Sequence, residues 1–239
     1  MLPWLSAHPV QFPPVSQALD QPSGLLAAGG TLEPAWLLAA YRQGIFPWYS
    51  DNQPILWWSP DPRTVLFPEE LHVSRSLAKR VRNGGFKVTF NRAFAAVVTA
   101  CSAPRPEQDG TWITQEMQDA YLTLHQLGYA RSVEIWDNKA LVGGLYGVAL
   151  GPVFFGESMF SHRRDASKIA LVHLVQAMRH DGGKLIDCQM HTQHLARLGA
   201  RNIARADFIG YLDTYLAVSK ASENQPPLPC WSLPSACPI

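Results

Sequence analysis

The chain has 239 residues, of which 47% are hydrophobic and 16% charged, and its 20 Lys and Arg against 19 Asp and Glu leave a formal net charge of +1. This composition is typical of a folded protein and excludes an intrinsically disordered one. No window of about 18 residues is free of charges and helix breakers, so we expect no membrane span, and the first residues lack the pattern of a signal peptide. The four cysteines do not have the spacing of a disulfide framework, which together with these features predicts a cytoplasmic protein.

Tryptophan and proline are concentrated near the start of the chain. Five of the eight tryptophans and 11 of the 19 prolines lie within residues 1–68. One helix is expected there: Thr31 is its predicted cap, apolar residues recur at helical spacing from Trp36, and Gly44 ends it. The shift in composition predicts a small N-terminal domain over residues 1–62.

From residue 63 to residue 222, short connections join alternating strands and helices. Apolar alternation and short apolar runs predict strands over residues 64–67, 86–90, 132–136, 140–150, 152–155, 184–189 and 203–204. Helical spacing and end signals predict helices over residues 74–83, 93–101, 114–127, 166–179, 192–198 and 207–219. Asn91 and Thr114 are the expected caps of two of these helices. The Pro-rich tail, residues 223–239, has no predicted regular structure.

The order of the later elements is typical of acyl-transfer folds of the N-acetyltransferase type. A three-strand meander, a helix, a buried strand, a short helix and a final strand follow one another. The sequence therefore predicts an α/β (α+β) protein, in which a GNAT-like N-acyltransferase domain over residues 63–222 follows a smaller N-terminal α/β domain. In coenzyme A users of that fold, glycines in the turn before the central helix let backbone amides cradle pyrophosphate, whereas residues 161–168 contain no glycine.

A local charge asymmetry interrupts the overall neutrality. Seven Lys and Arg stand between Arg63 and Arg92, against two Glu. The predicted helix over residues 74–83 carries four of them, namely Arg75, Lys79, Arg80 and Arg82. Two interpretations are open: a surface that binds the phosphates of a nucleic acid, or an ordinary solvated helix face.

Seven blocks of sequence, in order, carry a resemblance to a known family. The blocks are Gly24–Gly30, Tyr41–Trp48, Trp57–Arg63, Gly110–Thr114, Gly143–Gly147, Gly156–Phe160 and Lys184–Gln189. Together they closely resemble leucyl/phenylalanyl-tRNA–protein transferases, from about Gly24 to Leu212. The resemblance implies an enzyme without a cofactor that moves Leu, Phe and, less well, Met from aminoacyl-tRNA to the α-amino group of proteins with N-terminal Arg or Lys. Such transfer marks those proteins for N-end-rule degradation.

The resemblance also implies how the substrates are held. Leu-tRNA or Phe-tRNA replaces coenzyme A as acyl carrier, which agrees with the glycine-free turn, and the acceptor amine attacks the tRNA ester directly. The basic helix is then the expected tRNA-binding element. Trp48 matches the family's adenosine-contacting Trp and is the first candidate for stacking on the terminal adenosine, with Trp112 as the second. We expect the protein to act as a monomer, away from membranes.

Three polar residues are candidates for catalysis. Asp187 and Gln189 alternate on one predicted strand, so we expect them to point to the same face, and the matching pair in the family is proposed to attract the proton of the acceptor amine. The alternative is that Asp187 only satisfies backbone donors at the strand end. Glu157 stands among apolar residues and needs a partner, either a substrate cation or an internal base such as Arg163.

Six apolar residues match positions of the family's amino-acid pocket. They are Leu145, Met159, Leu171, Leu174, Met178 and Ile186. Adaptable Leu and Met side chains suit a Leu, Phe or Met substrate, whereas β-branched ones crowd the mouth of the pocket. Ordinary core packing is the alternative, and it is strongest for Leu174 and Ile186.

Two other functions stay open from the residues alone. One is a coenzyme A-dependent GNAT acetyltransferase, and the other is a non-catalytic tRNA-binding module that uses only the basic stretch and the tryptophans. A metal site is not expected, because Cys188, His191 and His194 do not have a standard ligand spacing.

Overall fold

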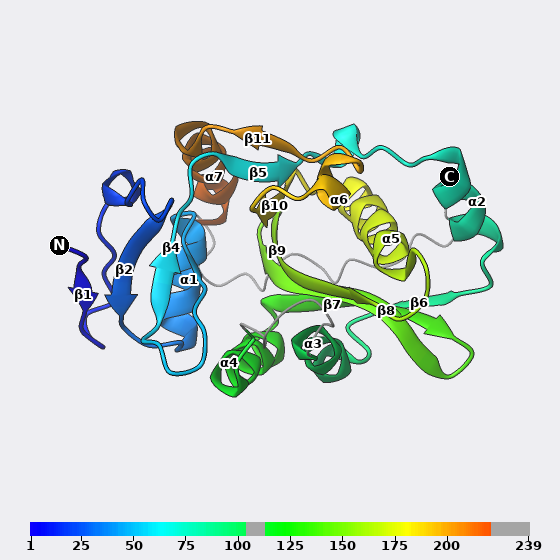
Figure 1. Ribbon diagram of the computed structural model, residues 1–239. Helices are drawn as coiled ribbons and strands as arrows, with labels where there is room; N and C mark the ends of the chain where they lie inside the picture. The colour runs from blue at the N-terminus through cyan, green and yellow to red at the C-terminus, as the bar shows by residue number, and fades with distance from the viewer. Residues whose placement is uncertain (104–112, 221–239) are drawn as a thin grey trace.

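The computed structural model describes residues 1–103 and 113–220, and their strands form a four-stranded and a seven-stranded sheet (Figure 1). The predicted mixed α/β fold is confirmed. The predicted tail, residues 223–239, lies outside the described residues, as does Trp112.

The smaller sheet is built from the first 58 residues. Its strands, in spatial order, are β1 (Trp4–Leu5), β2 (Leu25–Gly29), β4 (Leu56–Trp58) and β3 (Phe46–Pro47). Helix α1 (Pro34–Arg42) packs its buried face, including Trp36 and Leu37, into the core beside this sheet. The buried ring of Trp57 stacks on Trp36, and its indole N–H donates to the carbonyl of Gly29. The aromatic residues of this region therefore form its core.

Thr31 does not cap α1. The N-cap is Glu33, because Pro34 occupies the first helical turn, where its missing N–H is tolerated. The Thr31 hydroxyl accepts a 3.4 Å hydrogen bond from the Glu33 amide instead. Gly44 follows the helix with a φ of 71°, the left-handed conformation expected of a terminating glycine.

The larger sheet contains the predicted meander. Its strands, in spatial order, are β11 (Arg201–Ile203), β5 (Arg63–Leu66), β10 (Leu185–Gln189), β9 (Val153–Ser161), β8 (Ala140–Leu150), β7 (Ala130–Asp137) and β6 (Lys87–Phe90). Strands β7, β8 and β9 are antiparallel neighbours, and β10 joins β9 in parallel. Strand β9 extends six residues past the predicted end at Phe155, because β8 pairs with it as far as Ser161.

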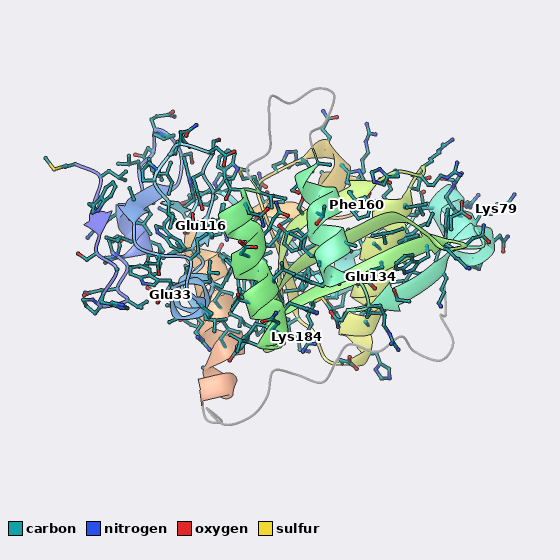
Figure 2. The ribbon with its side chains drawn as sticks, turned by 90° about the horizontal axis from the view of Figure 1, so that it is seen from below. Glu33, Lys79, Glu116, Glu134, Phe160 and Lys184 are labelled. Carbon is teal, nitrogen blue, oxygen red and sulfur yellow. The ribbon has the colours of Figure 1, made fainter. Side chains whose placement is uncertain are left out.

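Helices cover both faces of the larger sheet. On one face lies the apolar helix α5 (Ala166–His180), against which α2 (Arg75–Asn83) packs. On the other face lie α3 (Phe94–Ser102) and α4 (Gln115–Gln126), which Figure 2 shows in front of the sheet. The short helix α6 (Gln193–Ala196) follows β10, and α7 (Arg205–Lys220) contacts β9.

Of the two caps predicted for helices after residue 63, Thr114 holds and Asn91 does not. Ser74 and Thr114 each accept a hydrogen bond from the amide three residues on, at the start of α2 and α4. Asn91 instead takes a turn conformation with a φ of 56°, and its side chain accepts from the Ser132 amide of β7. It therefore secures the β6–α3 turn to the sheet, and Ala93 is the N-cap of α3.

The predicted domain boundary after residue 62 falls between β4 and β5, which belong to different sheets. The hydrophobic core does not stop there: one cluster of buried residues runs from Trp36 and Trp57 to Phe155 and Phe208. The division into two domains at residue 62 therefore remains a prediction.

Candidate active site

A pocket of about 690 Å³ opens in the larger sheet where β9 and β10 part. The two strands pair in parallel as far as Phe155 and Asp187, and β9 then continues along β8. Residues from β8, β9, α5, β10 and α6 line the pocket. A separation between two parallel strands thus creates the space for a substrate.

Two irregular strand pairings shape the wall. The register between β8 and β9 shifts at Glu157, which is one extra residue on β9. A second shift between Asp187 and Gln189 makes Cys188 the extra residue on β10, and Gln189 has a φ of 61°. Bulges re-aim side chains and interrupt regular alternation. The alternation from which we expected Asp187 and Gln189 to share one face is therefore broken.

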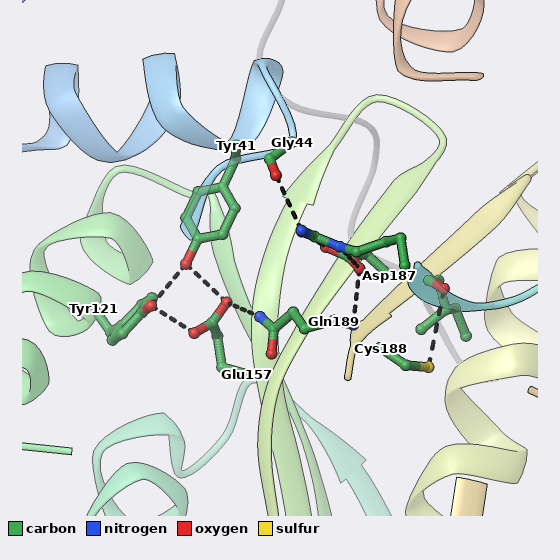
Figure 3. A network of polar contacts seen from close by, with 9 residues as sticks. Tyr41, Gly44, Tyr121, Glu157, Asp187, Cys188 and Gln189 are labelled. Atoms are coloured by element: carbon green, nitrogen blue, oxygen red, sulfur yellow. Dashed lines mark hydrogen bonds and ion pairs between the residues drawn. The ribbon is translucent and has the colours of Figure 1, made fainter. Parts of the chain in front are cut away.

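Glu157 is 7% exposed and accepts three hydrogen bonds (Figure 3). The hydroxyl of Tyr121 donates to Oε2 at 2.6 Å, and that of Tyr41 donates to Oε1 at 2.7 Å. The amide Nε2 of Gln189 donates to Oε1 at 3.2 Å, and the two tyrosine hydroxyl oxygens are themselves 2.7 Å apart. Glu157 does not pair with Arg163, whose guanidinium lies 3.6 Å from Asp137.

Burial dominates the electrostatics of this cluster. It raises the pKa of Glu157 to about 7, against hydrogen bonds from Tyr121 and Tyr41 that lower it. Burial and the charge of Glu157 raise the pKa of both tyrosines well above the usual value, so their hydroxyls keep their protons. Burial also raises the pKa of the Cys188 thiol, which disfavours its thiolate form.

Asp187 is held by an internal base. Its carboxylate receives Nε of Arg63 at 2.8 Å and Nη2 at 2.7 Å, and both side chains are fully buried. Oδ1 also accepts the backbone N–H of Gln189 at 2.9 Å, as the structural alternative for this residue predicted. The Arg63 guanidinium lies between the rings of Phe46 and Phe208. Arg63 thus contributes nothing to a basic surface, although it belongs to the basic stretch of the sequence.

Five of the six residues expected to form an amino-acid pocket line this one. They are Leu145, Met159, Leu171, Leu174 and Ile186. Met178 is fully buried one turn further along α5, where it packs against Gly183, and it does not line the pocket. Glu157, Asp187 and Gln189 line it as well, so the apolar and polar candidates meet in one space.

The tryptophan and the basic candidates lie outside the pocket lining. Trp48 is 36% exposed, and its ring packs at a steep angle against that of Trp58. On α2, the side chains of Arg75, Lys79 and Arg82 are exposed. Arg80 is half-buried and pairs at 3.5 Å with Asp165, the residue that precedes α5.

Four pocket-related residues escaped prediction: Tyr41, Tyr121, Arg63 and Tyr146. Tyr41, Arg63 and Tyr146 stand inside blocks that carry the family resemblance, so that resemblance was an available signal. Tyr121 gave only helical periodicity. Its proximity to Glu157 depends on α4 packing across the sheet, which no local pattern reveals.

Within residues 1–103 and 113–220, no helix is both long and apolar enough to cross a membrane. The same part of the chain contains no group of three His, Cys, Asp or Glu side chains arranged to hold a metal ion.

A mixed sheet with a pocket that joins apolar walls to a buried carboxylate is suited to acyl transfer. The comparisons with known proteins specify the class. The model of the leucyl/phenylalanyl-tRNA protein transferase family matches residues 65–213, and that of its N-terminal domain matches residues 30–61. The chain therefore belongs to the leucyl/phenylalanyl-tRNA–protein transferase family and is an aminoacyltransferase.

Relatives with this name span nearly the whole chain. The leucyl/phenylalanyl-tRNA–protein transferase of Chromohalobacter salexigens is 63% identical over 96% of this chain and 90% of its own length. That of Stutzerimonas stutzeri is 59% identical over 93% of this chain and 99% of its own length.

Solved structures give only a distant likeness. A GCN5-related N-acetyltransferase from Kribbella flavida is 15% identical, with a TM-score of 0.37 over 72% of this chain and 61% of that chain. L-PGS from Bacillus licheniformis is 13% identical, with a TM-score of 0.38 over 69% of this chain and 55% of that chain.

Proposed function

We propose that the protein transfers Leu, Phe and, less well, Met from aminoacyl-tRNA to the α-amino group of proteins that begin with Arg or Lys. The observation that carries this proposal is that apolar walls adjoin Glu157 and Gln189 in the same pocket. The transfer would mark acceptors for N-end-rule degradation in the cytoplasm, with the enzyme acting as a monomer and without a cofactor.

The apolar wall fits the side chain of the transferred amino acid. Leu145, Met159, Leu171 and Leu174 are unbranched at Cβ and flexible further out, so they can adapt to Leu, Phe or Met. A substrate branched at Cβ places extra bulk close to its own ester. Selection would therefore rest on shape near Cβ more than on total volume.

Glu157 is the group suited to accept the proton of the acceptor's α-ammonium. Glu157, Tyr41 and Tyr121 each contact the other two at hydrogen-bond distance, which makes three contacts. The two tyrosine hydroxyls supply only two protons for them. A third proton on Glu157 gives every contact one proton, so the cluster is built to take one up. A general base works best when its pKa is close to the surrounding pH, and the pKa of Glu157, about 7, is close to neutral pH.

The reaction then balances without a covalent enzyme intermediate. The α-ammonium gives one proton to Glu157, and the neutral amine nitrogen attacks the ester carbonyl carbon. A C–N bond forms, the C–O bond to the terminal ribose breaks, and the ribose oxygen leaves with the second amine proton. The products are the extended protein and uncharged tRNA.

Asp187 serves in this proposal as a positioning residue. Because Arg63 and the Gln189 amide occupy its oxygens, it is not a free base. It fixes the bulge of β10, and the bulge aims the Gln189 side chain at Glu157. Gln189 then holds the Glu157 carboxylate in place on the side of the transferred group.

The tRNA would be held by charge and stacking. The exposed Arg75, Lys79 and Arg82 of α2 provide sequence-independent phosphate contacts, with Arg80 fixed beside them. The partly exposed Trp48 offers a ring face for the terminal adenine, with Trp112 as a second candidate.

The residue at the start of α5 argues against coenzyme A as acyl carrier. Asp165 occupies the N-cap of this helix, where the pyrophosphate of that cofactor would meet backbone amides. Burial works to raise the pKa of Asp165, but Lys168, Arg164 and Arg80 outweigh burial and lower it. The ionised carboxylate would repel a phosphate.

The proposal is tested by incubating the purified protein with Leu-tRNA and two peptides that differ only in their first residue, Arg or Ala. Mass spectrometry should detect a Leu–Arg peptide bond and no Leu–Ala product. Titration calorimetry with acetyl-CoA should show no binding. Absence of Leu–Arg product, in conditions where an established family member forms it, would refute the proposal.

A further inference from the structure

Tyr146 has a buried hydroxyl without a hydrogen-bond partner among the described residues, although it lines the pocket. Its side chain is 1% exposed. The rings of Phe94 and Tyr121 pack against it edge to face, at centroid distances of 5.8 and 5.4 Å. An unpaired buried hydroxyl lowers stability, so its presence in a substrate pocket indicates that a substrate group supplies the partner.

The pocket reaches both faces of the larger sheet. Successive residues of a strand face opposite sides, and Leu145 packs with α5 while Tyr146 packs with α3 and α4. Glu157 lies on the side of Tyr146, since Tyr41 and Tyr121 bind it there. The apolar chamber is thus on one face of the sheet, and a polar chamber with Tyr146 and Glu157 is on the other.

Glu157 retains room for one more donor. A carboxylate offers about four lone-pair positions, and Tyr41, Tyr121 and Gln189 use three of them. Two donors are on Oε1 and one is on Oε2, so the remaining position is on Oε2. Burial and the charge of Glu157 also keep Tyr146 protonated, as a neutral hydroxyl with free acceptor positions.

We propose that the Tyr146 hydroxyl binds the α-amino group of the acceptor, beside the remaining position of Glu157. An ammonium carries three N–H donors, so one meets the Tyr146 oxygen, one meets Glu157, and the nitrogen's position relative to the ester is fixed. This assignment rests on the proposed function and adds a second acceptor-binding residue to it. Tyr146 would orient the amine, and Glu157 would receive its proton.

The test is Tyr146→Phe, which removes one oxygen and keeps the ring packing, with Tyr215→Phe on α7 as the matched control. With Leu-tRNA saturating and an Arg-starting peptide varied, kcat/KM for the peptide should fall about tenfold or more. The KM for Leu-tRNA should not rise, and the Tm should not fall. A peptide that begins with citrulline, which keeps the α-amine and loses the side-chain charge, should show the same fold loss.

Three results would overturn the assignment. Unchanged kinetics with a higher Tm would mean that the hydroxyl is a tolerated unpaired group. A rise confined to the KM for Leu-tRNA would mean that it binds the donor. A loss that disappears with the citrulline peptide would place it on the acceptor's side chain. Absence of transfer by the wild-type protein would instead refute the proposed function itself.

Discussion

Arg63 and Asp187 form an ion pair from which solvent is excluded, with two parallel contacts of 2.8 and 2.7 Å between side chains that are 0% exposed. The pair joins the first strand after the N-terminal sheet to the strand that carries Gln189. The remaining guanidinium nitrogen, Nη1, donates to the carbonyl of Gly44 at the end of α1. One side chain thus ties α1 and β5 to the site.

Breaking this ion pair should strongly lower both the stability and the activity of the protein. Asp187→Ala leaves a buried guanidinium without its counter-charge, so we expect the free energy of unfolding to fall by about 3–5 kcal/mol. Turnover should fall further than tRNA affinity, because Gln189 loses its anchor. Urea unfolding checks the first effect, and binding and rate assays check the second.

Glu70→Ala is the matched control for a surface pair. Glu70 and Arg201 form a similar contact at 2.8 Å, but both side chains are more than 40% exposed. The loss should be about 0–1 kcal/mol. If Asp187→Ala were as mild as Glu70→Ala, the ion pair would not anchor β5 to β10.

Glu157 should make stability depend on pH. Burial raises its pKa in the folded protein to about 7 from the ordinary value of 4.5, so between these values the folded state binds more protons than the unfolded state. The contribution of Glu157 to stability is therefore present at low pH and is lost as pH rises toward 7. Against Glu157→Gln, which cannot ionise, the wild type should lose stability between pH 5 and 8 in urea unfolding. If the stabilities of the wild type and Glu157→Gln changed with pH in the same way, the raised pKa would be contradicted.

The exposed charges of α2 should act on tRNA binding alone. Lys79→Ala should weaken binding and lower the slope of log K against log salt by about 0.7–0.9. Lys184→Ala is the control, because Lys184 is exposed and lies away from Lys79, as Figure 2 shows. Equal slopes for the two variants would remove α2 from the tRNA surface.

Much of the fold could be predicted because local signals agreed with the tertiary structure. Thr114 caps its helix as expected, and the meander follows from three apolar runs. Thr31 and Asn91 failed because a neighbouring proline and a long-range bond to Ser132 decided their roles. Caps are predictable only where no stronger constraint competes for them.

The site could be predicted as a set of residues more readily than as a geometry. Strand alternation and the family resemblance singled out Asp187 and Gln189, and its apolar surroundings singled out Glu157. The bulges that orient these residues have no local sequence signal. The partners of Asp187 and Glu157 stand 124 and 116 residues away in the chain, as Arg63 and Tyr41. Only the packed fold shows that one carboxylate is occupied and the other is available.

The most direct test is a crystal structure with a non-hydrolysable phenylalanyl-adenosine analogue bound. We expect the phenyl ring within about 4.5 Å of Leu145, Leu171 and Leu174, with the adenine stacked on Trp48 and the carbonyl at the end of the pocket near Glu157. A phenyl ring outside this pocket, or an adenine at the start of α5 beside Asp165, would contradict the account.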